Sequence, residues 1–123
     1  MYNSCFGEME YDYGWITKRD IQLFGKTFEI EVRIVSNDSE DGISEESEQS
    51  CLSYKDKEIE YLQCIEKLML EFSADAETRF TPCTLFIKAI GSCALLCSDV
   101  EDDDGIAVCI IPEKCVKYQC EFL

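Results

Sequence analysis

The stretch from Ile43 to Phe72 constrains the fold most, because no other segment is long enough and periodic enough to form a major helix. Its apolar residues recur at spacings of three, four or seven, which places them on one side of a 3.6-residue helix. They are Leu52, Ile59, Leu62, Ile65, Met69 and Phe72. Ser44 is the expected N-cap, accepting from the amide of Ser47 or of the residue before it. The stripe thins at residues 56–58, so we allow for a kink or a break into two helices there.

Alternating side chains predict strands before this helix. In residues 27–35 apolar side chains share one side of an extended chain and charged ones share the other, which is typical of a strand with one buried face. With residues 21–24 and a turn at Gly25, this stretch predicts a hairpin. We expect the remaining segments to be a bent strand, a polar connection and a turn-rich linker, over residues 5–15, 16–20 and 36–42 respectively.

Four strands are predicted after the helix. Pro82 has no amide to donate and restricts the residue before it, so the first strand should begin after this proline. The apolar run at 106–111 predicts a central strand covered on both faces. The four strands span residues 84–89, 92–98, 106–111 and 115–122. The chain is therefore predicted to be a single α+β domain (residues 1–123), in which a largely antiparallel sheet packs against one long or broken central helix. An N-terminal hairpin and a C-terminal meander make up that sheet.

The charge balance limits the partners that this chain can bind. Its 26 acidic and 11 basic residues give a net charge of -15. This excess repels phosphate backbones and anionic lipid, so we expect neither nucleic-acid nor membrane binding. It favours fast, salt-sensitive capture of a basic protein, or else it serves solubility alone.

The chain start and the cysteines indicate a compartment. Residues 1–4 lack the basic start of a signal peptide and no run approaches a membrane span, so we expect a cytoplasmic protein with reduced thiols. Nine cysteines, an odd number, argue against a complete disulfide framework. Cys93 and Cys97 would share one face of a strand but lie too far apart to share a metal, and Cys109, Cys115 and Cys120 are scattered. We expect these cysteines to be small buried hydrophobic residues, with a metal or redox site as the alternative.

The chain contains no histidine, which removes the commonest general base and the commonest metal ligand. Phosphate-binding loops of the Walker and Gly-x-Gly-x-x-Gly types are absent, as is a Gly-x-Ser-x-Gly nucleophile turn. We therefore predict a protein that is not an enzyme and has no catalytic, cofactor or metal site. Metal-dependent chemistry on carboxylates alone remains the alternative, although the acids are too numerous for a pair to be singled out.

The segment Asp99–Gly105 is a compact acidic loop. It fails as an EF-hand, because Gly105 at the sixth position would place Val100, which cannot ligate, at the first. Starting at Asp99 instead places Asp104 where the glycine belongs. We interpret the loop as a solvated hairpin tip or as a set of acids that face a basic partner. Gly105 is expected to adopt a positive φ, with an aspartate capping the turn.

Three aromatic residues near the N-terminus are candidates for either core or binding surface. They are Tyr11, Tyr13 and Trp15. Aromatic side chains dominate binding hot spots, but they also supply large apolar areas to a core. We favour the core for Trp15 and leave both possibilities open for the tyrosines.

Several motifs resemble a family of small bacterial domains of unknown function. In the C-terminal third these are Pro82-Cys83-Thr84-Leu85-Phe86-Ile87, the Gly91 turn, Asp103-Asp104-Gly105-Ile106-Ala107-Val108, Pro112 and Val116-Lys117-Tyr118-Gln119. In the N-terminal half they are Trp15, Ile21-Gln22-Leu23-Phe24-Gly25-Lys26, and Ile43 with Gln49. Some related small acidic proteins are immunity proteins beside polymorphic or contact-dependent toxins. The resemblance implies a cytoplasmic protein that binds a toxin domain, often a nuclease with a basic cleft, and blocks its active site.

Together these observations predict a non-enzymatic acidic binding protein, an immunity protein that neutralises a basic, nuclease-like toxin domain. The predicted partner-binding residues are the acids of the loop and of the first helical turn: Asp99, Glu101, Asp102, Asp103, Asp104, Glu45, Glu46 and Glu48. The alternative is an accessory domain that self-associates through an apolar edge at residues 115–123, with the acidic surface serving solubility.

Overall fold

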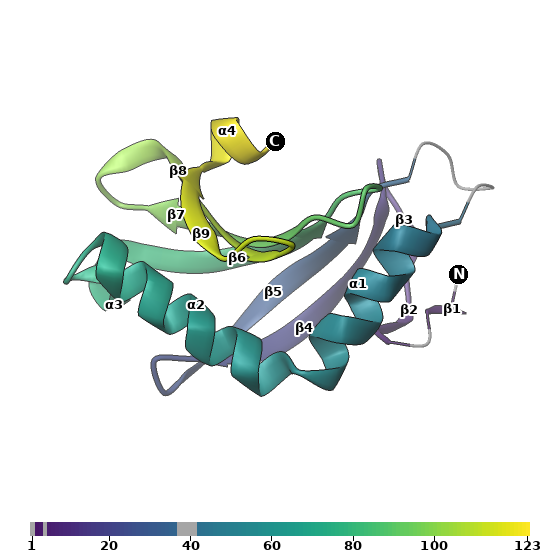
Figure 1. Cartoon of the computed structure of the whole chain (residues 1–123), viewed down its shortest axis with the longest axis horizontal. Helices are drawn as coiled ribbons and strands as arrows, with labels where there is room; N and C mark the ends of the chain where they lie inside the picture. The colour runs from purple at the N-terminus through teal and green to yellow at the C-terminus, as the bar shows by residue number, and fades with distance from the viewer. Residues whose placement is uncertain (1, 4, 37–41) are drawn as a thin grey trace.

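A computed structural model describes residues 2–3, 5–36 and 42–123 of the chain (Figure 1). The strands are β1 (Tyr2–Asn3), β2 (Gly7–Glu8), β3 (Glu10–Tyr11), β4 (Trp15–Leu23), β5 (Lys26–Ile34), β6 (Phe80–Ile87), β7 (Cys93–Asp99), β8 (Asp102–Ile111) and β9 (Cys115–Tyr118). The helices are α1 (Glu45–Asp56), α2 (Glu58–Phe72), α3 (Ala76–Arg79) and α4 (Gln119–Phe122). Most of the predicted linker, at 37–41, and Met1 and Ser4 of the predicted chain start lie outside the described residues.

One sheet of seven strands organises the fold, in the order β3-β4-β5-β6-β7-β8-β9. Neighbouring strands are antiparallel except β5 and β6, which run parallel. Parallel neighbours need a long crossover, and α1, α2 and α3 supply it. The α+β class is confirmed, with a hairpin at one side and a meander at the other, but the sheet is mixed because these two blocks join through a parallel pair.

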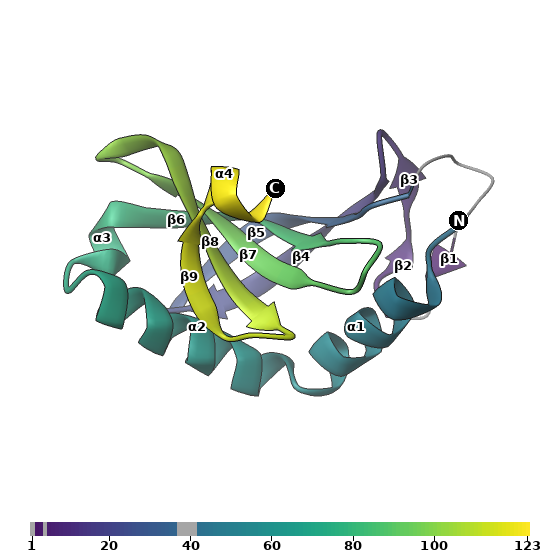
Figure 2. The same cartoon turned by 45° about the horizontal axis from the view of Figure 1, so that its top comes forward.

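Two separate helices cover one face of the sheet, at an angle to each other (Figure 2). The possibility of a single long helix is therefore wrong, and the break lies at Lys57, within the segment where the apolar stripe thins. The amide of Lys57 closes α1 by donating to the carbonyls of Ser53 and Tyr54. At the other end of α1 the predicted cap is confirmed, because the Ser44 hydroxyl accepts from the Ser47 amide at 3.1 Å.

The sheet is buried on both faces over its C-terminal half. On the helix face, Ile65 and Met69 of α2 belong to the same buried cluster as Val32 and Ile34 of β5 and Leu85 of β6. On the opposite face a smaller cluster joins residues of β7 and β8 to the last helix: Ala94, Leu96, Ala107, Cys109 and Phe122. The prediction that residues 106–111 form a central strand covered on both faces is confirmed for 106–110, while Ile111 is half-buried.

Near the N-terminus the hairpin is confirmed and its surroundings differ from the prediction. Phe24 and Gly25 both have positive φ (53° and 72°), as a two-residue hairpin turn requires. The expected polar connection at 16–20 is wrong, because these residues belong to β4 and pair with β5. The expected strand at 5–15 is also wrong. The strand residues in this range are those of β2 and β3 and the first residue of β4, Trp15, and the expected bend at Gly14 is a reversal of the chain between β3 and β4.

Two predicted boundaries in the C-terminal half are also wrong. Strand β6 begins at Phe80, before Pro82, because the ladder with β7 shifts register between Pro82 and Thr84, and such a bulge tolerates a residue without an amide proton. The last strand ends at Tyr118, not at Phe122, because α4 turns back over the sheet and buries the Phe122 ring.

Candidate functional site

The predicted loop at Asp99–Gly105 is wrong in its extent, because β7 ends at Asp99 and β8 begins at Asp102, which leaves only Val100 and Glu101 in the turn between them. Part of the charge of this acidic segment is neutralised within the chain. Asp99 accepts two hydrogen bonds from the guanidinium of Arg79, at 2.9 and 3.0 Å, and one from the amide of Glu101. A carboxylate oxygen of Glu101 also lies 3.1 Å from Arg79. The hydrogen bonds from Arg79 hold the pKa of Asp99 below its usual range. Asp99 therefore fixes the hairpin rather than offering a free carboxylate to a partner.

The same turn confirms the roles predicted for glycine and aspartate. Gly105 has a φ of +69°, and the Asp102 carboxylate accepts from the Asp104 amide at 2.9 Å. A Cβ atom at Gly105 would lie only 2.5 Å from the carbonyl oxygen of Cys97 and 2.7 Å from the Gln119 amide nitrogen. That nitrogen donates to the carbonyl of Cys97 at 3.0 Å, which ties α4 to the hairpin. Asp103 is exposed in the first part of β8.

The second predicted acidic surface is the first turn of α1, where Glu45, Glu46 and Glu48 are all exposed. It lies beside an open groove of about 520 Å³ between α1 and the turns that join the later strands. The groove is lined by Glu46, Gln49, Ser50, Ser53, Ile90, Gly91, Ser92, Ile111 and Pro112. Ile90, at its edge, is 75% exposed. This surface therefore combines carboxylates with apolar area.

The two predicted acidic surfaces lie far apart. Figure 2 shows the β7–β8 turn and the N-terminus of α1 at opposite ends of the long axis of the molecule. The eight predicted partner-binding residues therefore form two separate surfaces, and a small partner domain would contact one or the other.

The N-terminal aromatic residues divide between core and surface. Trp15 is buried, as predicted, and its ring packs edge-to-face on Tyr11 with centroids 5.3 Å apart. The Tyr11 hydroxyl donates to the carbonyl of Ser36 at 3.1 Å, so this tyrosine also has a structural role. Tyr13 is 90% exposed in the turn before β4. Of these three aromatic residues, Tyr13 is the one with a fully exposed side chain.

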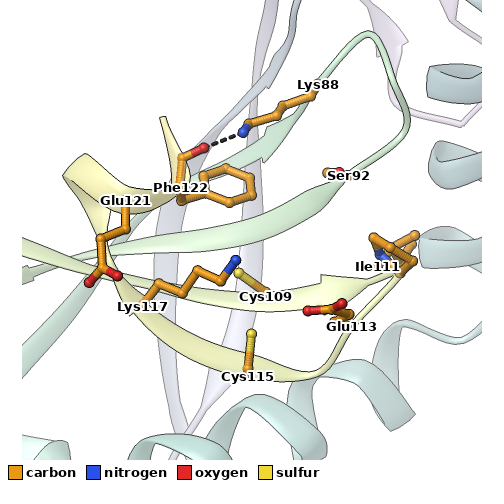
Figure 3. Close-up of a pocket in the computed structure, with 10 residues that line it drawn as sticks. Lys88, Ser92, Cys109, Ile111, Glu113, Cys115, Lys117, Glu121 and Phe122 are labelled. Carbon is orange, nitrogen blue, oxygen red and sulfur yellow. Dashed lines mark hydrogen bonds between the residues drawn. The ribbon is translucent and has the colours of Figure 1, made fainter.

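A pocket that we did not predict from the sequence lies on the sheet face opposite α1 and α2 (Figure 3). Its volume is about 230 Å³, and its lining residues are Lys88, Ser92, Cys109, Ile111, Pro112, Glu113, Cys115, Lys117, Glu121 and Phe122. Helix α4 forms one wall. Lys88 holds that wall in place, because its ammonium group donates to the carbonyl of Phe122 and lies 4.2 Å from the centre of the Phe122 ring.

Two cysteines meet in this pocket. Cys109 of β8 and Cys115 of β9 are directly paired across the antiparallel ladder, and the two thiols are within hydrogen-bonding reach. Burial and the neighbouring Cys115 raise the pKa of Cys109 to about 11, although Lys117 and Lys88 act in the opposite direction. The sequence pattern did not predict this pairing. Their positions around the turn at Pro112 were the available signal, since a short hairpin centred there brings residues 109 and 115 face to face.

The other cysteines agree with the predicted role of small core residues in most cases. Cys5, Cys51, Cys93 and Cys97 are buried, whereas Cys83 and Cys120 are exposed. In residues 2–3, 5–36 and 42–123, no three or more cysteine, aspartate or glutamate side chains come together as a metal ion would require.

The edge proposed for self-association is shorter than the sequence suggested. Strand β9 does lie at the edge of the sheet, but it has only four residues before the chain turns into α4. Very short edge strands are a device by which proteins limit edge-to-edge pairing. This geometry gives no support to self-association through residues 115–123.

Comparison of the chain with protein-family models, with curated proteins and with solved structures found no match. None of the helices in the described part of the chain has both the length and the apolar character needed to cross a membrane.

Proposed function

We propose that this chain is a non-enzymatic binding protein whose partner is a basic protein domain. The observation that carries the proposal is its charge. With 26 acidic against 11 basic residues, most carboxylates have no cation of the same chain to neutralise them. Such a surface attracts a basic partner over distances of about 10 Å at moderate salt and raises the rate of encounter.

Of the two acidic surfaces, the first turn of α1 is the one that we assign to the partner. At the β7–β8 turn, Asp99 and Glu101 are already engaged with Arg79. At α1 the exposed acids border a groove with the exposed apolar side chain of Ile90. Protein interfaces combine an apolar centre with a charged rim. Val100 is exposed at the β7–β8 turn as well, but the α1 acids border a groove that a partner side chain could enter.

The resemblance to immunity-protein-like domains suggests which basic partner to expect. We infer a toxin domain whose active-site cleft is basic, as in a nuclease, so that the carboxylates of Glu45, Glu46 and Glu48 occupy sites that otherwise attract phosphates. Blocking such a cleft requires binding but no chemistry, which agrees with a chain that has no histidine.

The first test is capture of a partner by the immobilised chain from native cell lysate at low salt, repeated at high salt. The expected result is retention of one basic protein that is lost as salt rises, because exposed charge pairs are screened. Recovery of the chain alone, or of a partner whose binding is independent of salt, would contradict the proposal.

The captured partner then allows the surface to be tested with two variants of equal charge change. One carries Glu45→Gln, Glu46→Gln and Glu48→Gln; its matched control carries Glu101→Gln, Asp102→Asn and Asp103→Asn. We expect the α1 variant to associate on the order of tenfold more slowly at low salt, with a flatter salt dependence, and the control to change little. If the control variant is the one that associates more slowly, the partner binds at the β7–β8 turn. If both variants associate as fast as the unmodified chain, neither acidic surface binds the partner.

A further inference from the structure

The pairing of Cys109 with Cys115 places two thiols within bonding range of each other. Residues directly opposite in an antiparallel ladder have Cα atoms about 4.5 or 5.5 Å apart and side chains on the same face. A disulfide requires a Cα separation of roughly 4.4–6.8 Å, so the two sulfurs can bond without a change in strand pairing.

The environment of this pair differs from that of the core cysteines. Cys93 and Cys97 are fully enclosed between the sheet and its helices, whereas Cys109 and Cys115 line a pocket of about 230 Å³ that opens beside α4. Cys115 is the more exposed of the two. Figure 3 shows the side chains of Lys88 and Lys117 entering the same pocket. Burial and Cys115 raise the pKa of Cys109, and the two lysines offset part of that rise. The site thus offers two sulfurs, access for a small molecule and two lysines, although Glu113 and Glu121 also line the pocket.

We propose that Cys109 and Cys115 form a redox-active dithiol that reacts with a small disulfide bearing carboxylate groups, of the glutathione disulfide type. Because the Lys88 ammonium is engaged by Phe122, Lys117 is the group that would bind a carboxylate of that reagent, which most of this acidic surface repels. This site is independent of the α1 surface and of the identity of the protein partner.

The reaction is a two-step thiol–disulfide exchange. Cys115, the more accessible thiol, loses its proton to solvent and attacks one sulfur of the small disulfide, which gives a mixed disulfide and releases one small thiolate. Cys109 then loses its proton and attacks the Cys115 sulfur, which forms the Cys109–Cys115 bond and releases the second small thiolate. The two protons lost by the cysteines convert the released thiolates to thiols. The dithiol is oxidised and the small disulfide is reduced to two thiols.

Formation of this bond would fasten the edge of the sheet. It would link β9 covalently to β8 across the turn that contains Pro112, directly before α4. The state of the dithiol would therefore determine how firmly the wall of the pocket is attached.

The test treats the reduced full chain with glutathione disulfide and follows it by intact mass and peptide mapping. We expect a product that has lost two hydrogen atoms and contains one linked pair, Cys109 with Cys115. Cys109→Ser should stop at a mixed disulfide on Cys115, and Cys115→Ser should form no internal link. The matched controls, Cys83→Ser and Cys120→Ser, remove exposed cysteines and should react as the unmodified chain does.

A second comparison isolates the role of the positive charge. Lys117→Gln should slow the reaction with glutathione disulfide roughly fivefold at low salt, the effect of about one close charge pair in water, and should leave the rate with the uncharged 2-hydroxyethyl disulfide unchanged. The proposal is overturned if the unmodified chain forms no internal link, or if the mapped bond joins other cysteines. Equal slowing with both reagents would refute the assignment of Lys117 to carboxylate binding.

Discussion

Gly105 provides a sharp test of how the β7–β8 hairpin and α4 are held together. In the variant Gly105→Ala, the alanine would have to adopt a φ of +69°. This left-handed conformation costs an L-amino acid about 1–2 kcal/mol. The added methyl group would also lie 2.5 Å from the Cys97 carbonyl oxygen, which belongs to the backbone of a central strand and cannot rotate away. Relieving that overlap costs about 1–3 kcal/mol more.

The methyl group also displaces the side chain of Gln119. Its amide nitrogen donates to the carbonyls of Cys97 and Ile106, at 3.0 and 3.4 Å, and stands 2.7 Å from the position of the new carbon. Loss of the shorter hydrogen bond adds about 1 kcal/mol. We therefore expect Gly105→Ala to lower the free energy of unfolding by about 3–6 kcal/mol in total.

Gly25→Ala is the matched control. Gly25 has a nearly identical φ of +72°, but a Cβ atom there would meet no atom within 4 Å. The variant Gly25→Ala should therefore lose only the about 1–2 kcal/mol of unfolding free energy that the left-handed conformation costs alanine. Alanine also restricts the unfolded chain, but this effect is the same in both variants. The assay is urea unfolding followed by the fluorescence of the single, buried tryptophan, Trp15, with unchanged m-values as the sign of a two-state comparison. Equal losses at Gly105 and Gly25 would refute the steric argument.

Two further predictions concern the helices. Replacing Ser44 by alanine should cost about 1 kcal/mol of unfolding free energy, because the hydroxyl caps α1 and also donates to the carbonyl of Ala89 at 2.6 Å; a loss below the error of urea unfolding would contradict this role. Burial raises the pKa of Glu58, but hydrogen bonds from Arg19 and Tyr54 outweigh it and hold that pKa below the ordinary value of 4.5. A carboxylate with a lowered pKa in the folded state stabilises the protein at pH values above its unfolded-state pKa. This stabilisation is lost as the pH falls through the folded-state pKa. The variant Glu58→Gln should therefore lose less stability than the unmodified chain below about pH 4.5. If the free energy of unfolding of that variant falls with acidification as steeply as that of the unmodified chain, Glu58 does not contribute to the pH dependence.

Features that depend on neighbours in the chain were predictable from the sequence. The cap at Ser44, the turn before Lys26 and the positive φ of Gly105 each follow from a few adjacent residues. The buried face of β5 and the apolar run of β8 follow from periodicity, because a side chain in a strand points to one face or the other according to its position. The acidic composition likewise fixed the kind of partner that we propose.

Features that depend on which elements become neighbours in space could not be predicted in this way. The parallel pairing of β5 with β6 was missed because it joins segments separated by the whole helical region. Pro82 was placed outside its strand because only the bulge against β7 makes room for it there. Local alternation predicted a strand for the last residues, whereas burial of Phe122 against the sheet favours α4.

The same distinction between local and tertiary features applies to the candidate sites. The sequence alone determined which residues carry charge, and so identified the acids of α1 and of the β7–β8 turn. Only the tertiary structure decided that these acids lie at opposite ends of the molecule and that Arg79 already engages Asp99, twenty positions along the chain. It also decided that Cys109 and Cys115 face each other in a pocket with two lysines. The physical reason is that a side chain's type is fixed by the sequence, whereas its partners and its exposure depend on the packing of residues that are distant in the chain.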